Sequence, residues 1–361
     1  MSRNPYLRSL SLASGVVAAS LLSGCVVAAL PVLAGGAIAT KAAKGKQHKG
    51  ERSTPTAQAK QVVTPEGTWT IVNAKEMPPP NGAVRGAPAP VAPAGPISAA
   101  VPLEMQYLYG SGEASAISLQ AYRALWNYLH VEIRYLRDKT QAKSVILTRD
   151  STLDAPKFDT CGDRKLAVVL DVDETSLLNL GFASDAARRG PGYDAGRWTR
   201  WEATGANKVV AVPGAAETLA AVRGDGITVI FNSNRSASSA VTTAAALEGA
   251  GLGPVVYGDT LWLRDDGTSS GKDERRWKIA ERYCVVAMVG DQLGDFSDLF
   301  NDPGLSVPAR RAAAAGAALS PLWGAGWFVL PNPVYGTALK GRMDDVFPPD
   351  RQWADPAEEK K

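Results

Sequence analysis

The stretch LAVVLDVDET at residues 166–175 decides the fold of this 361-residue chain. Its apolar first half has the pattern of a strand that is buried on both faces, as inside a parallel sheet. Ligands of open α/β sheets bind beyond the carboxyl ends of the strands. The sequence therefore predicts that Asp171 and Asp173, which directly follow the apolar run, project into a ligand site.

Two carboxylates at this spacing suit phosphoryl transfer. An ionised Asp171 can attack phosphorus and form an aspartyl-phosphate. Asp173 can protonate the leaving oxygen and later accept a proton from the hydrolytic water. Taken alone, the pattern fits an acidic turn at the end of a strand equally well, so the assignment depends on motifs further along the chain.

A second apolar strand, ITVIF at 227–231, ends in small polar residues and one arginine. Ser233 can donate a hydrogen bond to a phosphoryl oxygen. Asn234 and Arg235 follow at the turn into the next predicted helix, where backbone N–H groups favour anions. Turn geometry alone also explains such residues. A third element is Lys272 at a predicted helix start, where its charge opposes the helix dipole and needs a partner.

The fourth element is the apolar run VVAMV at 285–289, which leads into Asp291 and Asp295. Several aspartates near one phosphate would repel it, so a hard divalent cation is implied. Oxygen ligands and a need for open coordination positions indicate Mg²⁺. The sequence therefore predicts one Mg²⁺ ion per active site.

In order and spacing, these four elements resemble the motifs of the haloacid dehalogenase phosphohydrolase superfamily. The D-x-D-x-T pattern of that superfamily is met by Asp171, Asp173 and Thr175. More narrowly, the chain resembles the class C bacterial acid phosphatases of subfamily IIIB, the lipoprotein-type 5′-nucleotidases among them. It shares with them D-x-D-E-T, a serine before Asn-Arg, G-D-x-L-x-D-F, and LPNPVYG at 330–336; the resemblance spans residues 103–342.

The resemblance implies roles for the residues of the motifs. Asp171 would be the nucleophile and a metal ligand, and Asp173 the acid/base, with its carbonyl oxygen on the metal. Asp291 would be the remaining protein ligand of the metal. Ser233 and Lys272 would hold the transferring phosphoryl oxygens.

The resemblance also implies residues around this centre. Asp295 would orient a metal-bound water or the motif lysine, and Thr175 would support the first motif. Asn234 and Arg235 would contact the substrate. Tyr335 would lie against the base of a nucleotide substrate, although a buried structural tyrosine fits the position equally well.

The alternation of helical and apolar stretches predicts an α/β fold with a doubly wound parallel sheet, haloacid dehalogenase-like by the resemblance. Helices are expected at 114–139, 213–223, 236–251 and 273–282, and further strands at 260–263 and 327–330.

A small helical cap is expected at 176–212, inserted after the first catalytic strand and standing over the active site. It contains Tyr193, Trp198 and Trp201. These aromatic residues either contact an aromatic leaving group or pack the cap, and packing is the favoured interpretation.

The amino terminus predicts the compartment. Two arginines precede an apolar stretch that ends in LSGC at 22–25, the plan of a signal peptide whose final cysteine resembles a bacterial lipobox. Lipidated Cys25 would anchor the protein at a membrane. A simple secretory signal or an uncleaved membrane helix extended by residues 26–39 is the alternative. The expected location is the cell envelope, the outer membrane being favoured over the inner, with the catalytic domain in the periplasm or at the surface.

The expected organisation follows from composition. Residues 1–24 form the signal peptide, 25–102 a lipidated and disordered Pro/Ala/Lys-rich tether, 103–345 the phosphatase domain, and 346–361 a flexible tail. A segment with the composition of the tether cannot bury a core. One short strand at 68–73 is expected within it.

The charge distribution argues against nucleic acid as a partner. The chain has 39 basic and 36 acidic residues, but eight of the basic residues and one acidic residue lie before residue 61. The remainder carries 31 basic against 35 acidic residues, so there is no basic domain to bind nucleic acid.

Other phosphatase chemistries are excluded by residue type. The two histidines are His48, among lysines and glycines, and His130, in an amphipathic stretch, so a histidine nucleophile has no plausible site. No cysteine is followed by an arginine six positions later, which removes the cysteine phosphatase loop. The segment 267–272 is too short for a nucleotide-binding P-loop and lacks its Ser or Thr.

Two cysteines remain after Cys25, namely Cys161 and Cys284, and each shortly precedes a strand that ends in a catalytic aspartate. By resemblance to the superfamily sheet these strands are neighbours, which places both cysteines at the same far end. An oxidising periplasm permits a disulfide between them. Two buried free thiols are the alternative.

The sequence thus predicts a membrane-anchored, Mg²⁺-dependent phosphomonoesterase that acts on small phosphate esters, nucleotides among them. A binding module on the same fold and a phosphotransferase that passes the phosphoryl group to an alcohol are the alternatives. The presence of Asp171 argues against the binding module. The sequence leaves open the natural ester and whether copies of the chain associate into a homo-oligomer.

Overall fold

The computed structural model describes residues 60–64, 67–71, 100–136, 142–190 and 192–355. The predicted signal peptide, Cys25, most of the tether and the last six residues lie outside the described residues. Predictions about them therefore have no counterpart in the structure. Within the described part of the chain, no helix combines the length and the apolar character needed to cross a membrane.

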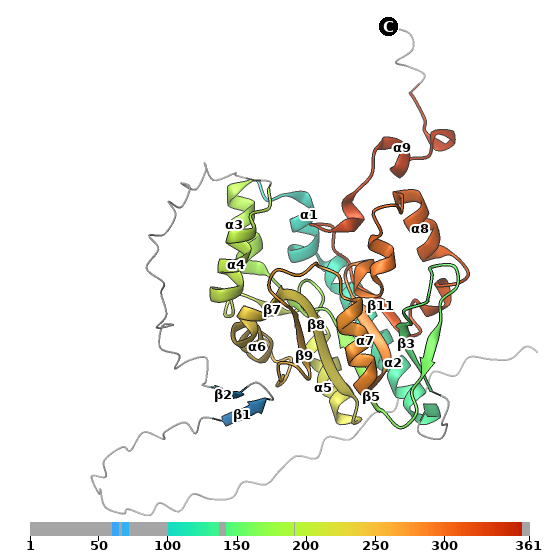
Figure 1. The fold of residues 1–361 in the computed structure, drawn as a ribbon. Coiled ribbons are helices and arrows are strands. Elements are labelled where there is room, and N and C mark those ends of the chain that lie inside the picture. The colour runs from blue at the N-terminus through green and yellow to red at the C-terminus, as the bar shows by residue number, and fades with distance from the viewer. Residues whose placement is uncertain (1–59, 65–66, 72–99, 137–141, 191, 356–361) are drawn as a thin grey trace, which may run out of the picture. The chain divides into compact units, whose positions relative to one another are not determined.

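The centre of the fold is a sheet of five parallel strands in the order β11-β10-β5-β8-β9 (Figure 1). The strands are β5 (Lys165–Leu170), β8 (Thr228–Ser236), β9 (Leu261–Arg264), β10 (Tyr283–Gly290) and β11 (Trp327–Val329). The motif strand β5 lies in the middle, between β8 and β10. The predicted α/β fold with a parallel sheet is confirmed.

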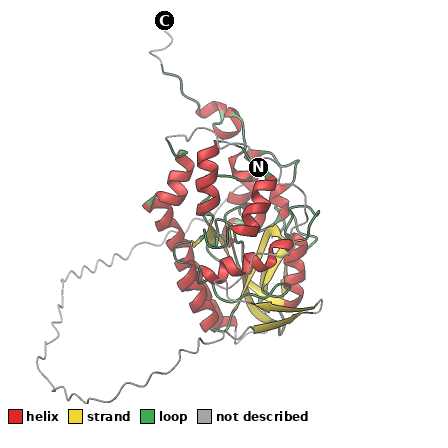
Figure 2. Cartoon of the chain, turned by 90° about the vertical axis from the view of Figure 1, so that its left-hand side faces the viewer, coloured by secondary structure: helices red, strands yellow, loops and turns green. Residues whose placement is uncertain are grey.

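Alternate residues of β5 face two different apolar layers. Val168 and Leu170 belong to the core that includes side chains of α2 (Gly112–Leu136), α5 (Ala215–Gly224) and α6 (Ala240–Gly249). Ala167 and Val169 belong to the second core, which includes Ile279 of α7 (Asp273–Arg282). Helices therefore cover both faces of the sheet, as the view in Figure 2 also shows.

The structure differs from the sequence-based bounds at the second motif. A helix was expected over 236–251, but β8 continues to Ser236, where it pairs with Arg264 of β9. A 3-10 turn, Ala237–Ser239, then precedes α6. Ser236 accepts a hydrogen bond from the N–H of Ser238, so this residue ends the strand and caps the turn.

The segment after β5 forms the expected insertion, with two helices above a short base (Figure 1). Its elements are β6 (Leu177–Leu178), α3 (Leu180–Arg189), α4 (Ala195–Thr204) and β7 (Val210–Ala211), and β6 pairs antiparallel with β7. Trp198 packs edge to face on Phe182, with 4.9 Å between ring centroids, and Trp201 lies 6.1 Å from the same ring. The two tryptophans thus pack the cap, whereas Tyr193 is 74% exposed.

Several elements were not anticipated. The hairpin of β3 (Lys143–Leu147) and β4 (Phe158–Thr160) supplies Val145 and Ile146 to the second core. In the tether, β2 (Gly67–Ile71) pairs antiparallel with β1 (Lys60–Thr64), so the expected short strand has a partner strand. The remaining α-helices of the described residues are α1 (Leu103–Met105), α8 (Val307–Ala315) and α9 (Met343–Val346), with a π-helical turn at Gln106–Gly110.

Cys161 and Cys284 form a disulfide, with 5.0 Å between their Cα atoms. It ties the segment after β4 to the start of β10, at the end of the sheet away from the motif aspartates, because Cys284 lies opposite Leu166 in the parallel register. The bridge closes a separation of 123 residues, and long loops of this kind restrict the unfolded chain most.

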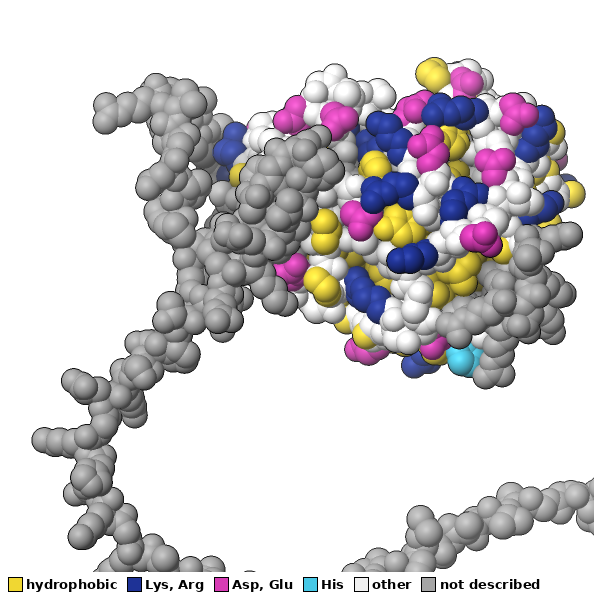
Figure 3. Space-filling model, turned by 60° about the horizontal axis from the view of Figure 1, so that its bottom comes forward, with side chains coloured by type: hydrophobic (Ala, Val, Ile, Leu, Met, Phe, Trp, Pro, Cys, Tyr) yellow, Lys and Arg dark blue, Asp and Glu magenta, His cyan; other side chains and the backbone are white. Residues whose placement is uncertain are grey.

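Figure 3 shows the lower face of the protein. Lys and Arg side chains are interspersed there with Asp and Glu side chains and with apolar side chains. Neither sign of charge dominates this face.

Candidate active site

The loop after β5 folds back so that its two aspartates serve one site. The N–H groups of Ser176 and Leu177 both donate to the carbonyl oxygen of Val172, and the Ser176 hydroxyl donates to the carbonyl oxygen of Asp171 at 2.6 Å. Glu174, in the middle of this turn, has φ of +54°, the one positive value among the described residues other than glycine. Such a backbone conformation is uncommon for a residue with a side chain and is often found at functional sites.

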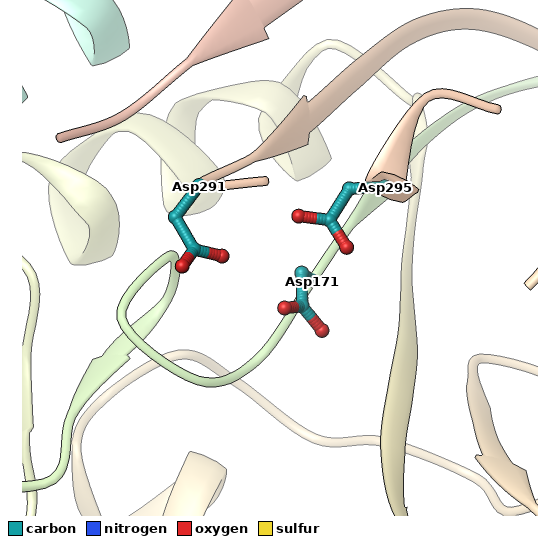
Figure 4. A group of neighbouring side chains, drawn as sticks. All are labelled: Asp171, Asp291 and Asp295. Atoms are coloured by element: carbon teal, nitrogen blue, oxygen red, sulfur yellow. The ribbon is translucent and has the colours of Figure 1, made fainter. Parts of the chain in front are cut away.

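Three aspartates from two strand ends converge at the carboxyl edge of the sheet (Figure 4). One carboxylate oxygen from each of Asp171, Asp291 and Asp295 lies within 4.8 Å of the others. We call these three residues the carboxylate cluster. Gly290 allows the close approach of Asp295, because a Cβ atom at this glycine would lie 2.3 Å from the Asp295 Cβ.

Asp291 is oriented from both of its oxygens. Thr175 donates to Oδ1 at 3.1 Å, and Asn332 donates to Oδ2 at 2.7 Å. Gln292 also donates to Oδ2, at 3.2 Å. The predicted supporting role of Thr175 corresponds to this contact, whereas Asn332 belongs to the LPNPVYG segment and was not anticipated. Hydrogen bonds of this kind fix the orientation of carboxylates that bind metal ions.

Lys272 is 5% exposed and reaches the cluster from the start of α7. Its Nζ lies 2.6 Å from Oδ1 of Asp171 and 2.7 Å from Oδ1 of Asp295. These are the partners that the unfavourable helix position of the lysine requires. The first N–H groups of α7 instead donate to Asp298, an acid that suits a helix N-terminus. Asp295 thus orients Lys272, one of the two roles expected of it.

One ammonium group lies in a cluster of three carboxylates, two of them buried and one partly buried, and the pKa values reflect this imbalance. Burial raises the pKa of Asp171 well above its ordinary value, although the Lys272 charge acts in the opposite direction. Burial and the neighbouring Asp295 charge raise the pKa of Asp291 to about 7. The cluster therefore carries more negative charge than the protein itself neutralises.

Asp173 lies in a different environment. Arg235 donates to Asp173 Oδ1 through Nη2 at 2.7 Å and through Nε at 3.0 Å. Asn179 donates to the same oxygen at 2.9 Å, and Ser233 donates to Oδ2 at 3.4 Å. Burial alone would raise the pKa of Asp173, but Arg235 and Asn179 hold it below its ordinary value. We call Asp173, Asn179, Ser233 and Arg235 the Asp173 group.

Glu174 joins three distant segments beside the Asp173 group. Its carboxylate accepts hydrogen bonds from the hydroxyl groups of Tyr109 and Tyr335 and from the backbone and side chain of Asn179. Burial and the charge of Asp173 raise the pKa of Glu174 to about 7. Tyr335 is 41% exposed, so part of its ring faces solvent next to the site.

Two residues expected to contact substrate have other partners. The side chain of Asn234 donates to the carbonyl oxygen of Ser270 at 2.9 Å and accepts from Arg275 at 2.6 Å. It therefore fixes the loop that leads to Lys272. Arg235 is buried against Asp173 and Asn179, so in the structure it contacts a catalytic candidate.

The donor set fits a divalent cation. Carboxylate oxygens are the ligands that hard cations prefer, and the cluster has an excess of them over the single lysine. The carboxylate oxygens of Asp171 and Asp291 point into the cluster. Neither residue has both of its oxygens bound by backbone N–H groups or by Lys272. Both oxygens of Asp295 have such donors, because Lys272 bonds Oδ1 and the N–H of Gln292 bonds Oδ2 at 2.9 Å.

The structure brings together the carboxylate cluster, Asp173, Ser233 and Lys272, all of which were chosen from sequence. It adds Glu174, Asn179, Gln292 and Asn332. Their sequence signal was position alone: Glu174, Gln292 and Asn332 lie within quoted motifs, and Asn179 follows the first motif by four residues. Nothing in the sequence showed that their side chains point into the site.

Comparisons with known proteins agree with this geometry. The family model for the HAD superfamily, subfamily IIIB (acid phosphatase), matches residues 113–338, more than half of the chain. A structure of the class C acid phosphatase from Bacillus anthracis is similar at 25% sequence identity with a TM-score of 0.50, over 65% of this chain and 84% of that one. A structure of the same Bacillus anthracis enzyme with tungstate bound has a TM-score of 0.52 at 23% identity, over 67% and 92% of the two chains.

The second likeness supports the fold alone, whereas the family match covers all four motifs and the LPNPVYG segment. A hydrolase is therefore the correct class, and the alternative of a binding module without activity is not favoured. The chain belongs to subfamily IIIB of the haloacid dehalogenase superfamily, and it is a phosphomonoesterase of the acid phosphatase family.

Proposed function

We propose that the protein is a Mg²⁺-dependent acid phosphatase that hydrolyses small phosphate esters through a phosphoryl group carried on Asp171. The observation that carries the proposal is the carboxylate cluster with Lys272 inside it: three carboxylates within 4.8 Å and one ammonium. One Mg²⁺ ion held by Asp171, Asp291 and the carbonyl oxygen of Asp173 would neutralise charge on the phosphoryl group.

In the first step, a carboxylate oxygen of Asp171 attacks phosphorus while the bond from phosphorus to the leaving-group oxygen breaks. Asp173, in its protonated form, gives its proton to that oxygen. In the second step, water attacks phosphorus and Asp173 takes a proton from it, which releases inorganic phosphate and restores Asp171. Ser233 and Lys272 donate to the phosphoryl oxygens; Lys272 has a third N–H besides those directed at its two carboxylates.

The resting state of Asp173 bears on the pH range. Arg235 and Asn179 keep its pKa low, so the free enzyme holds it ionised. Two effects supply the proton. The negative charge of a bound phosphate ester raises the pKa of a neighbouring carboxyl group, and below about pH 6 a phosphate monoester itself carries one proton. Activity should therefore be favoured on the acidic side of neutrality.

The test is phosphate release by the purified full chain from aryl phosphates, glycerol phosphate and nucleoside monophosphates, with Mg²⁺, with Ca²⁺ or with EDTA. We expect turnover with Mg²⁺, loss with EDTA and no turnover by Asp171→Asn. No release by the unchanged chain between pH 4.5 and 7.5 would overturn the proposal. Recovery of the phosphoryl group on added alcohol in place of water would show a phosphotransferase.

We further propose nucleotides among the substrates, in keeping with the 5′-nucleotidase resemblance. The support is the partly exposed ring of Tyr335, which is tied to the site through Glu174 and, by its carbonyl oxygen, through Gln292 at 3.2 Å. Tyr335→Ala should raise KM for nucleoside monophosphates by about 10-fold, the scale of one base stacked on an aromatic ring. It should leave KM for glycerol phosphate unchanged, and equal changes for both substrates would contradict the idea.

The location is likewise a proposal: lipid attachment at Cys25 to a membrane of the cell envelope, with the catalytic domain outside the cytoplasm. The support is the LSGC segment after an apolar stretch. Mass spectrometry of the mature protein should find an acylated N-terminal Cys25, and Cys25→Ala should release the chain from the membrane fraction. An unmodified N-terminus on the native chain would contradict the assignment.

A further inference from the structure

Asn179 lies between the acid/base candidate and the cap. It directly follows β6, precedes α3 and is 2% exposed. Two of the groups around its side chain can only donate hydrogen bonds, which makes its orientation unambiguous.

The amide oxygen of Asn179 accepts from Arg235 Nη2 at 2.9 Å and from Trp201 Nε1 at 3.1 Å. Both partners can only donate. The amide nitrogen donates to Asp173 Oδ1 at 2.9 Å and to the Glu174 carboxylate at 3.1 and 3.2 Å. With the oxygen turned toward these two donors, the nitrogen faces the two carboxyl groups, so the position requires one accepting atom and one donating atom side by side. An aspartate or a leucine cannot satisfy this set of partners.

The contacts on Asp173 are unequal. Oδ1 accepts from Arg235 Nη2, Arg235 Nε and Asn179 at 2.7 to 3.0 Å. Oδ2 has longer contacts, 3.3 Å from Arg235 Nε and 3.4 Å from the Ser233 hydroxyl. Oδ1 is therefore saturated with donors, and Oδ2, on the side of Ser233, is the oxygen that is able to carry a proton.

We propose that Asn179 is a positioning residue for the acid/base step, and that Trp201 of the cap holds Asn179 in place. By binding Oδ1 of Asp173, Asn179 leaves Oδ2 to give its proton to the leaving-group oxygen, as the phosphorus to leaving-group bond breaks and the bond to Asp171 forms. This inference rests on the proposed role of Asp173.

The Trp201 ring is closely packed in the cap. Trp201 belongs to α4, and its ring is packed against two glycines: a Cβ atom would lie 2.7 Å from the ring at Gly181 and 2.3 Å from it at Gly205. A side chain at either glycine would therefore displace the indole from Asn179. A displaced cap would remove the Trp201 donor and free the amide that orients Asp173.

The experiment compares kcat/KM of the full chain on aryl phosphates whose phenol leaving groups increase in basicity, from 2,4-dinitrophenyl to phenyl phosphate. The value of kcat/KM covers the steps up to departure of the leaving group. A good leaving group needs little proton donation, whereas a poor one depends on it, and general acid catalysis is worth about 10² to 10⁴-fold. The loss of kcat/KM caused by poor positioning of Asp173 should therefore grow with the basicity of the leaving group.

Asn179→Asp keeps the shape but replaces the donating nitrogen by an acceptor. We expect kcat/KM to fall by about 10 to 100-fold on phenyl phosphate and by less than about 3-fold on 2,4-dinitrophenyl phosphate, a part of the full acid effect. Trp201→Phe keeps an aromatic ring but removes the N–H together with part of the indole; it should show the same trend at about 3 to 10-fold. Equal losses on all substrates in both variants would overturn the proposal.

Trp198→Phe is the matched control. Trp198 also lies on α4 and also loses one N–H, but its Nε1 donates to Glu202 at 2.6 Å and not to Asn179. The loss of kcat/KM in Trp198→Phe should not grow with the basicity of the leaving group. Asp173→Asn distinguishes the role of Asn179 from the acid role of Asp173. If the loss of kcat/KM grows with leaving-group basicity in Asp173→Asn but is equal on all substrates in Asn179→Asp, the role of Asn179 alone is rejected. Equal losses in Asp173→Asn reject the acid role on which it rests.

Discussion

The carboxylate cluster and the Asp173 group lie at the same edge of the sheet but balance their charge differently. In the cluster, three neighbouring carboxylates share one ammonium, and the pKa of Asp171 is raised. In the Asp173 group, one carboxylate is bound by a guanidinium and an amide, and the pKa of Asp173 is lowered. The pKa values of two aspartates only two residues apart are therefore shifted in opposite directions.

This difference shows which of the two groups lacks positive charge. A buried carboxylate without sufficient positive charge is unfavourable unless it is protonated or binds a cation. The proposed divalent ion would supply the positive charge that the cluster lacks, whereas Arg235 supplies it to Asp173 within the protein. The two groups also draw on different segments: Asp291 and Asp295 follow β10, whereas Ser233 and Arg235 belong to β8.

The largest effects should come from exchanging each of the two aspartates for asparagine. Asp171→Asn removes the nucleophile and should lower kcat by at least about 10⁴-fold, the scale of losing a reacting group. It also removes one negative charge from a crowded cluster, so the melting temperature of the metal-free protein should stay the same or rise. Asp173→Asn should do the opposite to stability, because it leaves Arg235 buried without its charge partner, a loss of about 3 to 5 kcal/mol.

Thermal unfolding of both variants in EDTA checks this contrast. Similar decreases in melting temperature for the two variants would show that the cluster is as well balanced as the Asp173 group. The distinction between the two halves would then be wrong, even if both variants were inactive.

The next largest effect concerns the two buried cations. Lys272→Met leaves the cluster without its ammonium, and Arg235→Met leaves Asp173 without its guanidinium; each should cost about 3 to 5 kcal/mol of the free energy of unfolding in EDTA. An ion that binds the folded state alone stabilises it. Mg²⁺ should therefore restore more stability to Lys272→Met than to Arg235→Met, because the ion enters the cluster and not the Asp173 group.

Urea unfolding of the two variants with and without Mg²⁺ measures this difference. Equal recovery in both variants would mean that the ion does not replace the missing charge in the cluster.

A third prediction uses pH. The pKa of Asp291 is raised to about 7 by burial and by Asp295, so this carboxyl group is protonated below that pH in the metal-free protein. Metal ions bind ionised carboxylates, so Mg²⁺ affinity should rise with pH by up to about 10-fold per unit through pH 7 for each proton released. In the metal-free protein the same raised pKa makes stability fall as pH rises from about 4, where the carboxyl group ionises in the unfolded chain, to about 7.

Calorimetric titration with Mg²⁺ at pH 5.5 and pH 7.5, in two buffers of different ionisation enthalpy, measures both affinity and proton release. An affinity that does not change across this range would contradict the raised pKa of the cluster.

The sheet and the motif residues could be predicted from sequence because they depend on local pattern. Apolar runs ending in Asp171, Ser233 and Asp291 mark parallel strands, and parallel strands bring their ends together. The partners of these residues depend on side-chain direction, which no local pattern contains. Arg235 was expected to face substrate and faces Asp173, because the fold of the loop after β5 decides what lies opposite it.

The smallest effect should come from Tyr335→Phe. This variant tests whether Glu174, beside the Asp173 group, keeps enough hydrogen-bond donors when one is removed. The change removes one of the donors to Glu174 and keeps the aromatic ring. Tyr109 and Asn179 remain as donors to the same carboxylate, so the loss of stability should be about 1 kcal/mol, the scale of one hydrogen bond. The hydrogen bond from Tyr335 lowers the pKa of Glu174, so its removal should shift that pKa upward from about 7.

Because Asp173 keeps its contacts with Arg235 and Asn179, kcat/KM on phenyl phosphate should change by less than about 3-fold in Tyr335→Phe. Tyr109→Phe is the matched control, since it removes the other tyrosine hydroxyl from Glu174. If either single change lowered kcat/KM on phenyl phosphate as much as Asn179→Asp, the orientation of Asp173 would depend on the protonation and hydrogen bonding of Glu174. The Asp173 group would then depend on Glu174 for its orientation, as the carboxylate cluster depends on the proposed ion for its charge balance.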